Sequence, residues 1–323
     1  MSKYLSDQNS LAFTYESGTY GSTSGTGQWI GLVQEHSPDE STNAIPIRYQ
    51  GSTDRNVDTF ADGNKDFTGT FTYFPQDWKF LGMAIGSVSE TATAGSHVIT
   101  ETNTDDANYA IAAQSLSSFT LVDAKNNGTA GANAIRTING CLVNTFDVTW
   151  AQGEVVSCEV GYNAQNGIYT SGAVTAVTPS TTKPYMFSDF TLDLPSGTNF
   201  DNVTEVSLSI NNNLEPGHYL NGSRVAKEQL PLNRDYEVSA TLWADSSNTK
   251  TLYENYFQGG SIFNGLISCV GQAGSLYLTM SGCKITDMEM PSPMEGVNEQ
   301  TITFVPQHIT TVVHDAITDY NAF

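Results

Sequence analysis

Positive charge is scarce in this sequence. Only 13 Lys and Arg stand against 34 Asp and Glu, which gives a formal net charge of -21 over 323 residues. A surface with this balance repels phosphate, so the sequence excludes binding to nucleic acid or to an anionic membrane through a basic face. Long apolar runs are also missing. None approaches the roughly 18 residues of a membrane span, and the polar N-terminus lacks the apolar core of a signal peptide, so we expect a soluble protein that the Sec pathway does not export.

Cysteine is rare as well. The four thiols, at Cys141, Cys158, Cys269 and Cys283, form no CxxC pair and fall in apolar segments. With a hairpin turn at Gln152, Cys141 and Cys158 would lie about two pairs out of register for a bridge between strands. We therefore expect buried free thiols rather than disulfides.

Catalytic and metal-binding signatures are missing too. The sequence contains no GxSxG, Walker A or HExxH motif, and no GxGxxG that leads into a helix. The five histidines are scattered, which argues against a metal site. Asp54, Asp58, Asp62 and Asp66 recur every four residues but lack the glycine and glutamate positions of an EF-hand, so a solvated loop is favoured over a calcium site. We predict no enzyme activity, no catalytic residue and no cofactor.

Alternation typical of β-strands dominates the rest of the sequence. In the stretch Ile138 to Asn163, apolar residues alternate with polar ones on both sides of Gly153. Glycine takes the positive φ of a tight turn at no steric cost, so this stretch is predicted to form a long antiparallel hairpin. A second stretch, Ser281 to Gln307, repeats the order of Gly-Cys, alternating arm, glycine turn and alternating return. We interpret the two hairpins as an internal duplication.

The duplication predicts a mainly β protein of two tandem β-sandwich or β-barrel modules, each with a short helix. The first module covers residues 1–178 and the second residues 179–323. Each has the order strand, long polar loop, strand, helix, strand and hairpin. The strand after the loop is Phe67 to Tyr73 in the first module and Tyr236 to Leu242 in the second. The helices are predicted at Gln76 to Gly86 and from Asp245 to about Ser268.

Three segments lack a clear period. The first 30 residues, rich in glycine and hydroxyl groups, are predicted to be an extended arm, and Gly167 to Pro184 is predicted to link the modules. Pro38 to Asp66 is a polar stretch of mixed charge, longer than the connections that compact modules normally keep. It is either solvated surface or a loop that reaches a neighbouring subunit.

This arrangement resembles the tail tube proteins of long-tailed phages and related archaeal viruses. The likeness is carried by Glu16 to Gly21, Arg55 to Gly86, Gly140 to Asn163, Val203 to Asn213 and Leu230 to Ala244. In that family, subunits form rings whose sheets join into one barrel, the rings stack into a tube, and DNA passes through the lumen. The resemblance implies a structural virion protein of the viral tail. Its implied partners are further copies of the chain, a tape measure protein, tail-tip and terminator proteins, and double-stranded DNA that passes without specific binding.

Strand geometry determines how many modules such a ring needs. Strands about 4.8 Å apart and tilted by about 40° give a 24-stranded barrel a diameter of about 48 Å, with roughly 38 Å left inside the side chains. Twelve strands would leave about 14 Å, too narrow for duplex DNA of roughly 20 Å. About six four-stranded modules are needed, which predicts homotrimeric, pseudo-hexameric rings of two-module chains. The alternative is a homohexamer in which one half of each chain decorates the outside of the tube.

Five residues are predicted to act at the interfaces of this tube. Arg48, Arg55 and Asp58, in the long polar loop, are candidates for contacts between stacked rings. Asp147 and Glu159, on the hairpin face opposite its apolar residues, are candidates for an acidic lumen along which DNA slides. A secreted or surface β-sandwich that binds carbohydrate or acts as an adhesin also suits the Tyr- and Thr-rich composition, but the missing signal peptide argues against it.

Overall fold

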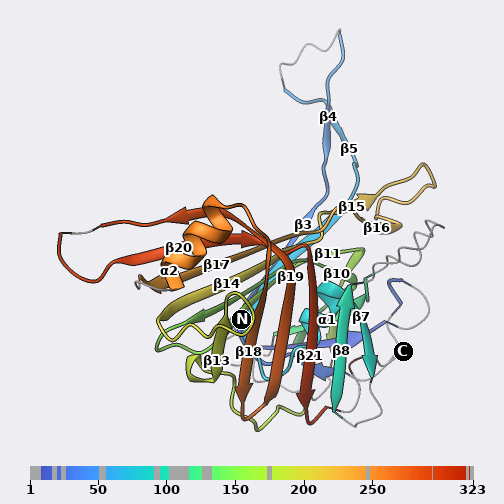
Figure 1. Cartoon of the computed structure of the whole chain (residues 1–323). Coiled ribbons are helices and arrows are strands. Elements are labelled where there is room, and N and C mark those ends of the chain that lie inside the picture. The colour runs from blue at the N-terminus through green and yellow to red at the C-terminus, as the bar shows by residue number, and fades with distance from the viewer. Residues whose placement is uncertain are drawn as a thin grey trace.

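Antiparallel strands make up most of the structure, as the alternating sequence predicts (Figure 1). The computed structural model describes residues 9–16, 20–22, 27–50, 56–90, 95–101, 116–125, 133–172, 177–244, 248–292, 294–317 and 320. Within these ranges every helix is short. The predicted mainly β fold with a short helix in each half is confirmed.

One sheet of eight antiparallel strands, here called the central sheet, runs through both halves of the chain. The two halves meet where β10 pairs with β14, from Thr145↔Asn211 to Ala151↔Glu205. In spatial order its strands are β3 (Leu32–Ser41), β6 (Asp66–Phe74), β11 (Ser157–Ala164), β10 (Asn133–Ala151), β14 (Val203–Asn211), β17 (Asp235–Trp243), β20 (Glu299–Val305) and β19 (Gly274–Glu289). Within the described residues, β3 and the C-terminal part of β19 are its open edges.

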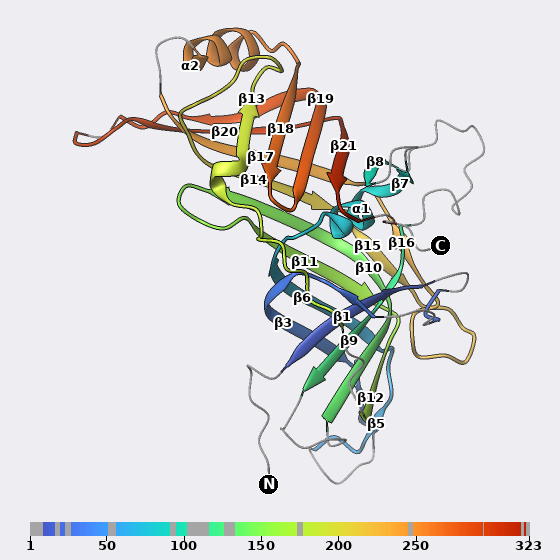
Figure 2. The same cartoon turned by 90° about the horizontal axis from the view of Figure 1, so that it is seen from below.

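Two smaller sheets share the long strands β10 and β19 with the central sheet (Figure 2). One contains, in order, β2 (Gln28–Trp29), β1 (Ser10–Tyr15), β9 (Phe119–Lys125), the N-terminal part of β10 and β12 (Asn166–Gly172). The other contains β13 (Phe190–Asp193), β18 (Phe263–Gly271), the N-terminal part of β19, β21 (His308–Asp315), β8 (Ser96–Glu101) and β7 (Gly86–Glu90). Because β7 and β8 come from the first half but join β21, the two halves are also linked through this second sheet.

Two hairpins leave the central sheet at corresponding places. β4 (Ile45–Ile47) and β5 (Thr59–Ala61) connect β3 to β6 and form a thin arm that stands away from the sheets (Figure 1). β15 (Leu214–Gly217) and β16 (Glu228–Pro231) connect β14 to β17. We call them the first arm and the second arm.

The buried faces of the three sheets enclose one hydrophobic core. Helix α1 (Lys79–Ile85) lies inside it with all of its residues buried, as the apolar face of Gln76 to Gly86 predicts. The ring of Phe80 lies 5.0–5.7 Å from four other aromatic rings, those of Phe13, Phe71, Tyr73 and Phe119. Such pairs contribute about 0.5–1.5 kcal/mol each beyond the burial of apolar area. The helix therefore anchors β1, β6 and β9 to one another.

The second helix is shorter than predicted. α2 (Asn248–Thr251) continues as the π-helical segment η4 (Leu252–Gln258), and the chain from Phe263 onward forms β18 instead of helix. β18 lies between β13 and β19, so its buried side chains recur at every second residue. One further turn, η3 (Phe187–Asp189), is a 3-10 helix.

Three segments predicted to be irregular contain strands. Ser10–Tyr15 is β1, buried and paired on both sides, rather than part of a free arm. The polar stretch from Pro38 begins inside β3 and carries the first arm, and the predicted linker begins inside β12. A short strand that is buried on both faces, or polar on both, has no period of two, so alternation alone does not find it.

The pairing register repeats between the two halves. β10 pairs with β12 from Asn133↔Gly172 to Asn139↔Asn166, and β19 pairs with β21 from Ser275↔His314 to Ser281↔His308. Every one of these positions is shifted by 142 residues, with no insertion. The β10–β11 and β19–β20 hairpins keep the same shift, including a bulge between Val143 and Thr145 and one between Ile285 and Asp287.

The other strands of the central sheet repeat in the same way. β3 is bulged between Val33 and Glu35, and β14 between Val203 and Glu205, a shift of 170. β6 and β17 correspond with a shift of 169, which aligns Phe67 to Tyr73 with Tyr236 to Leu242 as the sequence predicts. The order β3-β6-β11-β10 of the first half is therefore the order β14-β17-β20-β19 of the second.

Candidate self-assembly surfaces

The central sheet has one face on the core and one face exposed. Along β10 the side chains of Phe146, Val148 and Trp150 are buried, so Thr145, Asp147 and Thr149 lie on the opposite face. The same alternation continues in six of the other seven strands, and the pairing of β3 with β6 places Glu35, Ser37 and Asp39 on the same face. The exposed face therefore extends over both halves of the chain as one continuous surface, here called the outward face.

Asp147 and Glu159, predicted from the sequence to share a surface, lie directly opposite each other on this outward face. Glu159 is also opposite Thr72, which is opposite Glu35. On the other side, Asp147 is opposite Ser209, which is opposite Glu237. One row across six strands thus holds four carboxylates. Like charges facing each other across strands destabilise a sheet by roughly 0.2–1 kcal/mol per pair, so stability of the subunit does not explain this row.

The rest of the outward face has the same character. In the next row five hydroxyl side chains and one carboxylate lie opposite one another in turn: Ser157, Thr149, Ser207, Ser239, Thr303 and Asp287. Among the residues that the eight strands contribute to the central sheet, Lys284 is the one Lys or Arg, and its Nζ donates to the backbone oxygen of Gly260. The outward-face carboxylates are Glu35, Asp39, Asp66, Asp147, Glu159, Glu205, Asp235, Glu237, Asp287, Glu289 and Glu299.

The edges of the central sheet form the second candidate surface. Inside the chain, β10 is joined to β14, and hydrogen bonds at both ends mark the join: Asn212 N–H donates to Asn144 O over 2.8 Å and Gln152 N–H to Thr204 O over 2.9 Å. By the repeat, β19 corresponds to β10 and β3 corresponds to β14. The two open edges of the sheet are therefore equivalent to two strands that already fit each other.

The same hydrogen bond, from an Asn side chain to an Asp carboxylate, fixes the base of each arm. Asn43 has φ 43° and its amide donates to Asp66 Oδ2 over 2.6 Å. Asn213 has φ 47° and its amide donates to Asp235 Oδ2 over 2.8 Å. Positive φ is uncommon outside glycine and is tolerated by Asn. Both arms therefore leave the sheet through the same backbone geometry.

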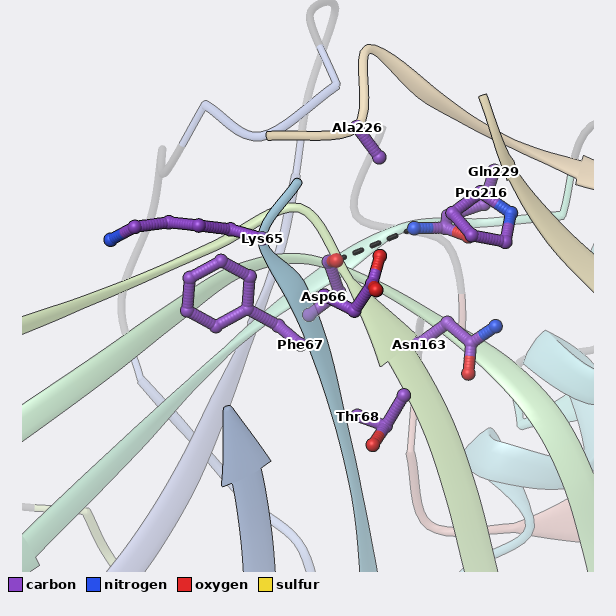
Figure 3. A pocket seen from close by; sticks show the side chains of 9 residues that line it. Lys65, Asp66, Phe67, Thr68, Asn163, Pro216, Ala226 and Gln229 are labelled. Atoms are coloured by element: carbon purple, nitrogen blue, oxygen red, sulfur yellow. Dashed lines mark hydrogen bonds between the residues drawn. The ribbon is translucent and has the colours of Figure 1, made fainter. Parts of the chain in front are cut away.

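The second arm lies on the first half of the chain. Its His218 Nε2 is 2.9 Å from Asp66 Oδ1, and Gln165 Nε2 donates to Lys227 O over 3.4 Å. Gln229 Nε2 donates to Ala164 O over 3.3 Å. Figure 3 shows Pro216, Ala226 and Gln229 of this arm facing Asp66, Phe67 and Asn163 across a cavity of about 20 Å³, room for one water molecule. This contact area is called the arm seat.

Strands β4 and β5 of the first arm, by contrast, are mostly exposed. Their apolar side chains are accessible to solvent, with 56% of Ile45 and 66% of Phe60 exposed. Arg48 and Asp58 flank the turn of the arm and are both exposed, whereas Arg55 lies outside the described residues. Sequence reasoning singled out the charges of this arm but missed the second arm, whose signal was the shared Asn and Pro at 43 and 46 and at 213 and 216.

In the described part of the chain, no cluster of His, Cys, Asp and Glu is suited to hold a metal ion. No described helix is long and apolar enough to cross a membrane. All four cysteines are free and buried, as the register of the hairpin predicts.

Comparison with known proteins assigns the chain that carries these surfaces to a family. The family model described as phage tail tube protein matches residues 7–306, which include the whole central sheet and both arms. No curated protein matches the chain.

Proposed function

The chain belongs to the phage tail tube protein family, a structural family of the virion tail, and we propose that three copies close each ring of a tail tube. The observation that carries the proposal is the continuous eight-stranded central sheet. Its two open edges correspond to the two strands that join its halves, so the sheet is built to continue into a second copy of itself. Head-to-tail contacts of this kind close into a ring when the rotation per subunit permits.

The pairing of β10 with β14 inside the chain gives the strand register expected between neighbouring chains. If β19 pairs with β3 of the next copy as β10 pairs with β14, Asp287 lies opposite Ser41 and Glu289 opposite Asp39. The hydrogen bond from Asn212 to Asn144 then becomes one from Thr42 N–H to Thr286 O of the neighbouring copy. Pro38 would lie opposite Met290, one residue beyond the end of β19, so the N–H that proline lacks falls just outside the new pairing.

The number of strands selects the number of chains. Three chains of eight strands give 24, and a barrel of 24 strands has a diameter of about 48 Å, wide enough for duplex DNA. Six chains that all contributed eight strands would give 48 strands and about 96 Å, far more than DNA needs. We therefore propose two modules per chain, at about residues 1–178 and 179–323, and a homotrimeric, pseudo-hexameric ring.

The outward face is proposed to line the lumen. Its rows of carboxylates and hydroxyls, Asp147 and Glu159 among them, repel phosphate, so DNA passes toward the host without adhering. This role also gives a reason for the like charges that face each other in one row. The tip of the first arm, with Arg55 and Asp58, is proposed to contact the next ring, and the tube to meet a tape measure protein and tail-tip and terminator proteins.

The symmetry of the assembled tube tests the proposal. A cryo-EM map of tubes formed by the purified chain is expected to show threefold rings, 24 continuous strands and two similar modules per chain. Sixfold rings in which one half of each chain leaves the barrel would overturn the trimer. Isolated globular particles at high protein concentration would count against tube formation itself.

A further inference from the structure

Among the described residues, strands β4 and β5 of the first arm are mostly exposed, whereas the corresponding part of the second arm lies on the first half of the chain. Residues of the second arm that occupy the arm seat are buried, with Ala226 2% and Gln229 7% exposed. The corresponding residues of the first arm are Val57 and Phe60, and Phe60 is 66% exposed. By the repeat, the surface of the second half that corresponds to the arm seat would be occupied by a first arm.

We propose that the first arm of each chain lies on the second half of the neighbouring copy in the same ring, and that Arg48 pairs there with Asp235. This inference rests on the proposed ring. Arg48 corresponds to His218, shifted by 170, and Asp235 corresponds to Asp66, shifted by 169. The pair His218–Asp66, 2.9 Å apart within the chain, becomes Arg48–Asp235 between chains. In both cases a nitrogen-bearing side chain of the arm faces a carboxylate oxygen.

Asp235 has one carboxylate oxygen held by Asn213 and the other available for this contact. Its Oδ2 accepts from Asn213, as Oδ2 of Asp66 accepts from Asn43. Oδ1 of Asp66 binds His218, whereas Oδ1 of Asp235 has no partner among the described residues. A guanidinium supplies several N–H donors to an exposed carboxylate, so Arg48 of a neighbour fits the open oxygen.

The side chains around this pair differ between the arm seat and the corresponding surface of the second half. In the arm seat inside the chain, Gln229 donates to Ala164 O. At the corresponding places the first arm has Phe60, and the second half has Val305 and Pro306. Polar Gln229 and Asn163, which both line the arm seat, thus correspond to apolar Phe60 and Val305. Val305 is 37% exposed in the isolated chain, and contact with Phe60 would remove both from water.

A second polar contact of the arm seat involves Gln165, and the corresponding residue of the second half, Gln307, is also a glutamine. Gln165 N–H donates to Asn139 O over 3.0 Å and its side chain reaches Lys227 O of the second arm. Gln307 N–H donates to Ser281 O, also over 3.0 Å, in the same position of the repeat. Its exposed amide is then expected to donate to the backbone oxygen of Asp58 in the neighbouring copy. Arg48 thereby moves from a contact between rings to a contact within one ring.

Site-specific cross-linking tests the placement. The double variant R48C/D235C, assembled and treated with a short bismaleimide, is expected to give covalent species of two and three chains and nothing larger, because contacts within a closed trimer end at three. The native cysteines are buried and do not interfere. R48C alone is the negative control, and H218C/D66C is the positive control, which should cross-link within one chain.

The outcomes separate this inference from the proposed ring. Tubes that form normally but give no cross-link between positions 48 and 235 overturn the placement and leave the ring intact. A ladder extending far beyond the ring size would put Arg48 between rings and overturn it too. A ladder ending at six chains would keep the placement and refute the trimer. In addition, R48E should raise the critical concentration for assembly about tenfold or more, and R48K should restore most of the loss.

Discussion

Gly140 and Gly282 hold the same backbone conformation at the same point of two long strands. Their φ angles are +66° and +63°, and each lies where a strand leaves its smaller sheet and enters the central sheet. β9 and β18 both show their register shift across this point, between Ile138 and Cys141 and between Met280 and Cys283. Each glycine therefore lets one strand belong to two sheets, and the central-sheet hairpin of each half depends on it.

Substitution of these glycines is expected to destabilise the subunit unequally. A Cβ at position 140 would lie 2.7 Å from Gln165 Cβ and 3.0 Å from Tyr20, whereas one at 282 would meet the mobile end of Gln307. Positive φ alone costs an L-residue about 1–2 kcal/mol. We expect G140A to lower the free energy of unfolding by about 3 kcal/mol and G282A by about 2 kcal/mol, measured by urea denaturation of unassembled subunits.

The matched control is Gly153, in the turn of the first hairpin. It also has positive φ, +84°, but a Cβ there would meet nothing within 4 Å. G153A should therefore show the conformational cost alone, about 1 kcal/mol. Equal losses in G140A and G153A would mean that the close approach of Gln165 and Tyr20 adds nothing.

The sequence correctly predicted the strands that have one buried face and one solvent-exposed face. Phe146 to Trp150 alternates cleanly because its strand separates the core from the outward face, and the Gly-Cys marks located both copies of the hairpin. The start of β18 was mistaken for helix because Leu252, Tyr256 and Phe263 fall at helical spacing, although the pairing of β18 with two strands determines its structure. Five consecutive buried residues in β1 gave no period at all.

Reversal of charge on the outward face is expected to slow DNA. In tubes of D147K/E159K, six chains in two stacked trimers would place twelve lysines around the lumen, each able to neutralise phosphate. We expect these tubes to retain double-stranded DNA at about 50 mM salt and to release it by about 200 mM, measured by co-sedimentation. E254K, on the exposed part of η4, introduces a lysine away from this face and should retain none. Equal retention by E254K would show that the outward face does not line the lumen.

Native thiols are expected to be inert until the subunit unfolds. Burial raises the pKa of Cys269 to about 12, with a further contribution from Asp189, and raises the pKa of Cys283 to about 11. Burial also raises the pKa of Cys141 and Cys158 well above the usual range. At pH 8 the thiolate fraction is then about one in a thousand or less.

Mass spectrometry after iodoacetamide measures this directly. Folded subunits at pH 8 should carry no adduct after an hour, and urea-unfolded subunits should carry four. The exposed thiol of R48C serves as the control, since it should be labelled in the folded state at an ordinary rate. Rapid labelling of folded wild type would contradict the burial of these residues in the sheets.

The surfaces were less accessible to sequence reasoning than the strands. Alternation placed Asp147 and Glu159 on one face, because period two fixes the side of a sheet on which a residue lies. It could not show that β10 pairs with β14, since a contact between residues about 60 positions apart leaves no local pattern. The match of Phe67 to Tyr73 with Tyr236 to Leu242 already implies that Asp66 corresponds to Asp235, but the contact of Asp66 with His218 is visible only in the folded chain.

Removal of the arm tip is expected to separate ring closure from ring stacking. The described strands of the first arm are mostly exposed, so replacement of residues 50–55 by a shorter turn, with Val57 kept, should leave the free energy of unfolding of the subunit unchanged. Arg48 and Asp58 remain, so the proposed contact with Asp235 of the neighbouring copy is retained. We expect single rings in negative-stain images and a loss of long tubes, whereas R48E should reduce rings and tubes together. Tubes of normal length from the shortened chain would show that the tip does not join the rings, and that stacking depends on other surfaces of the subunit.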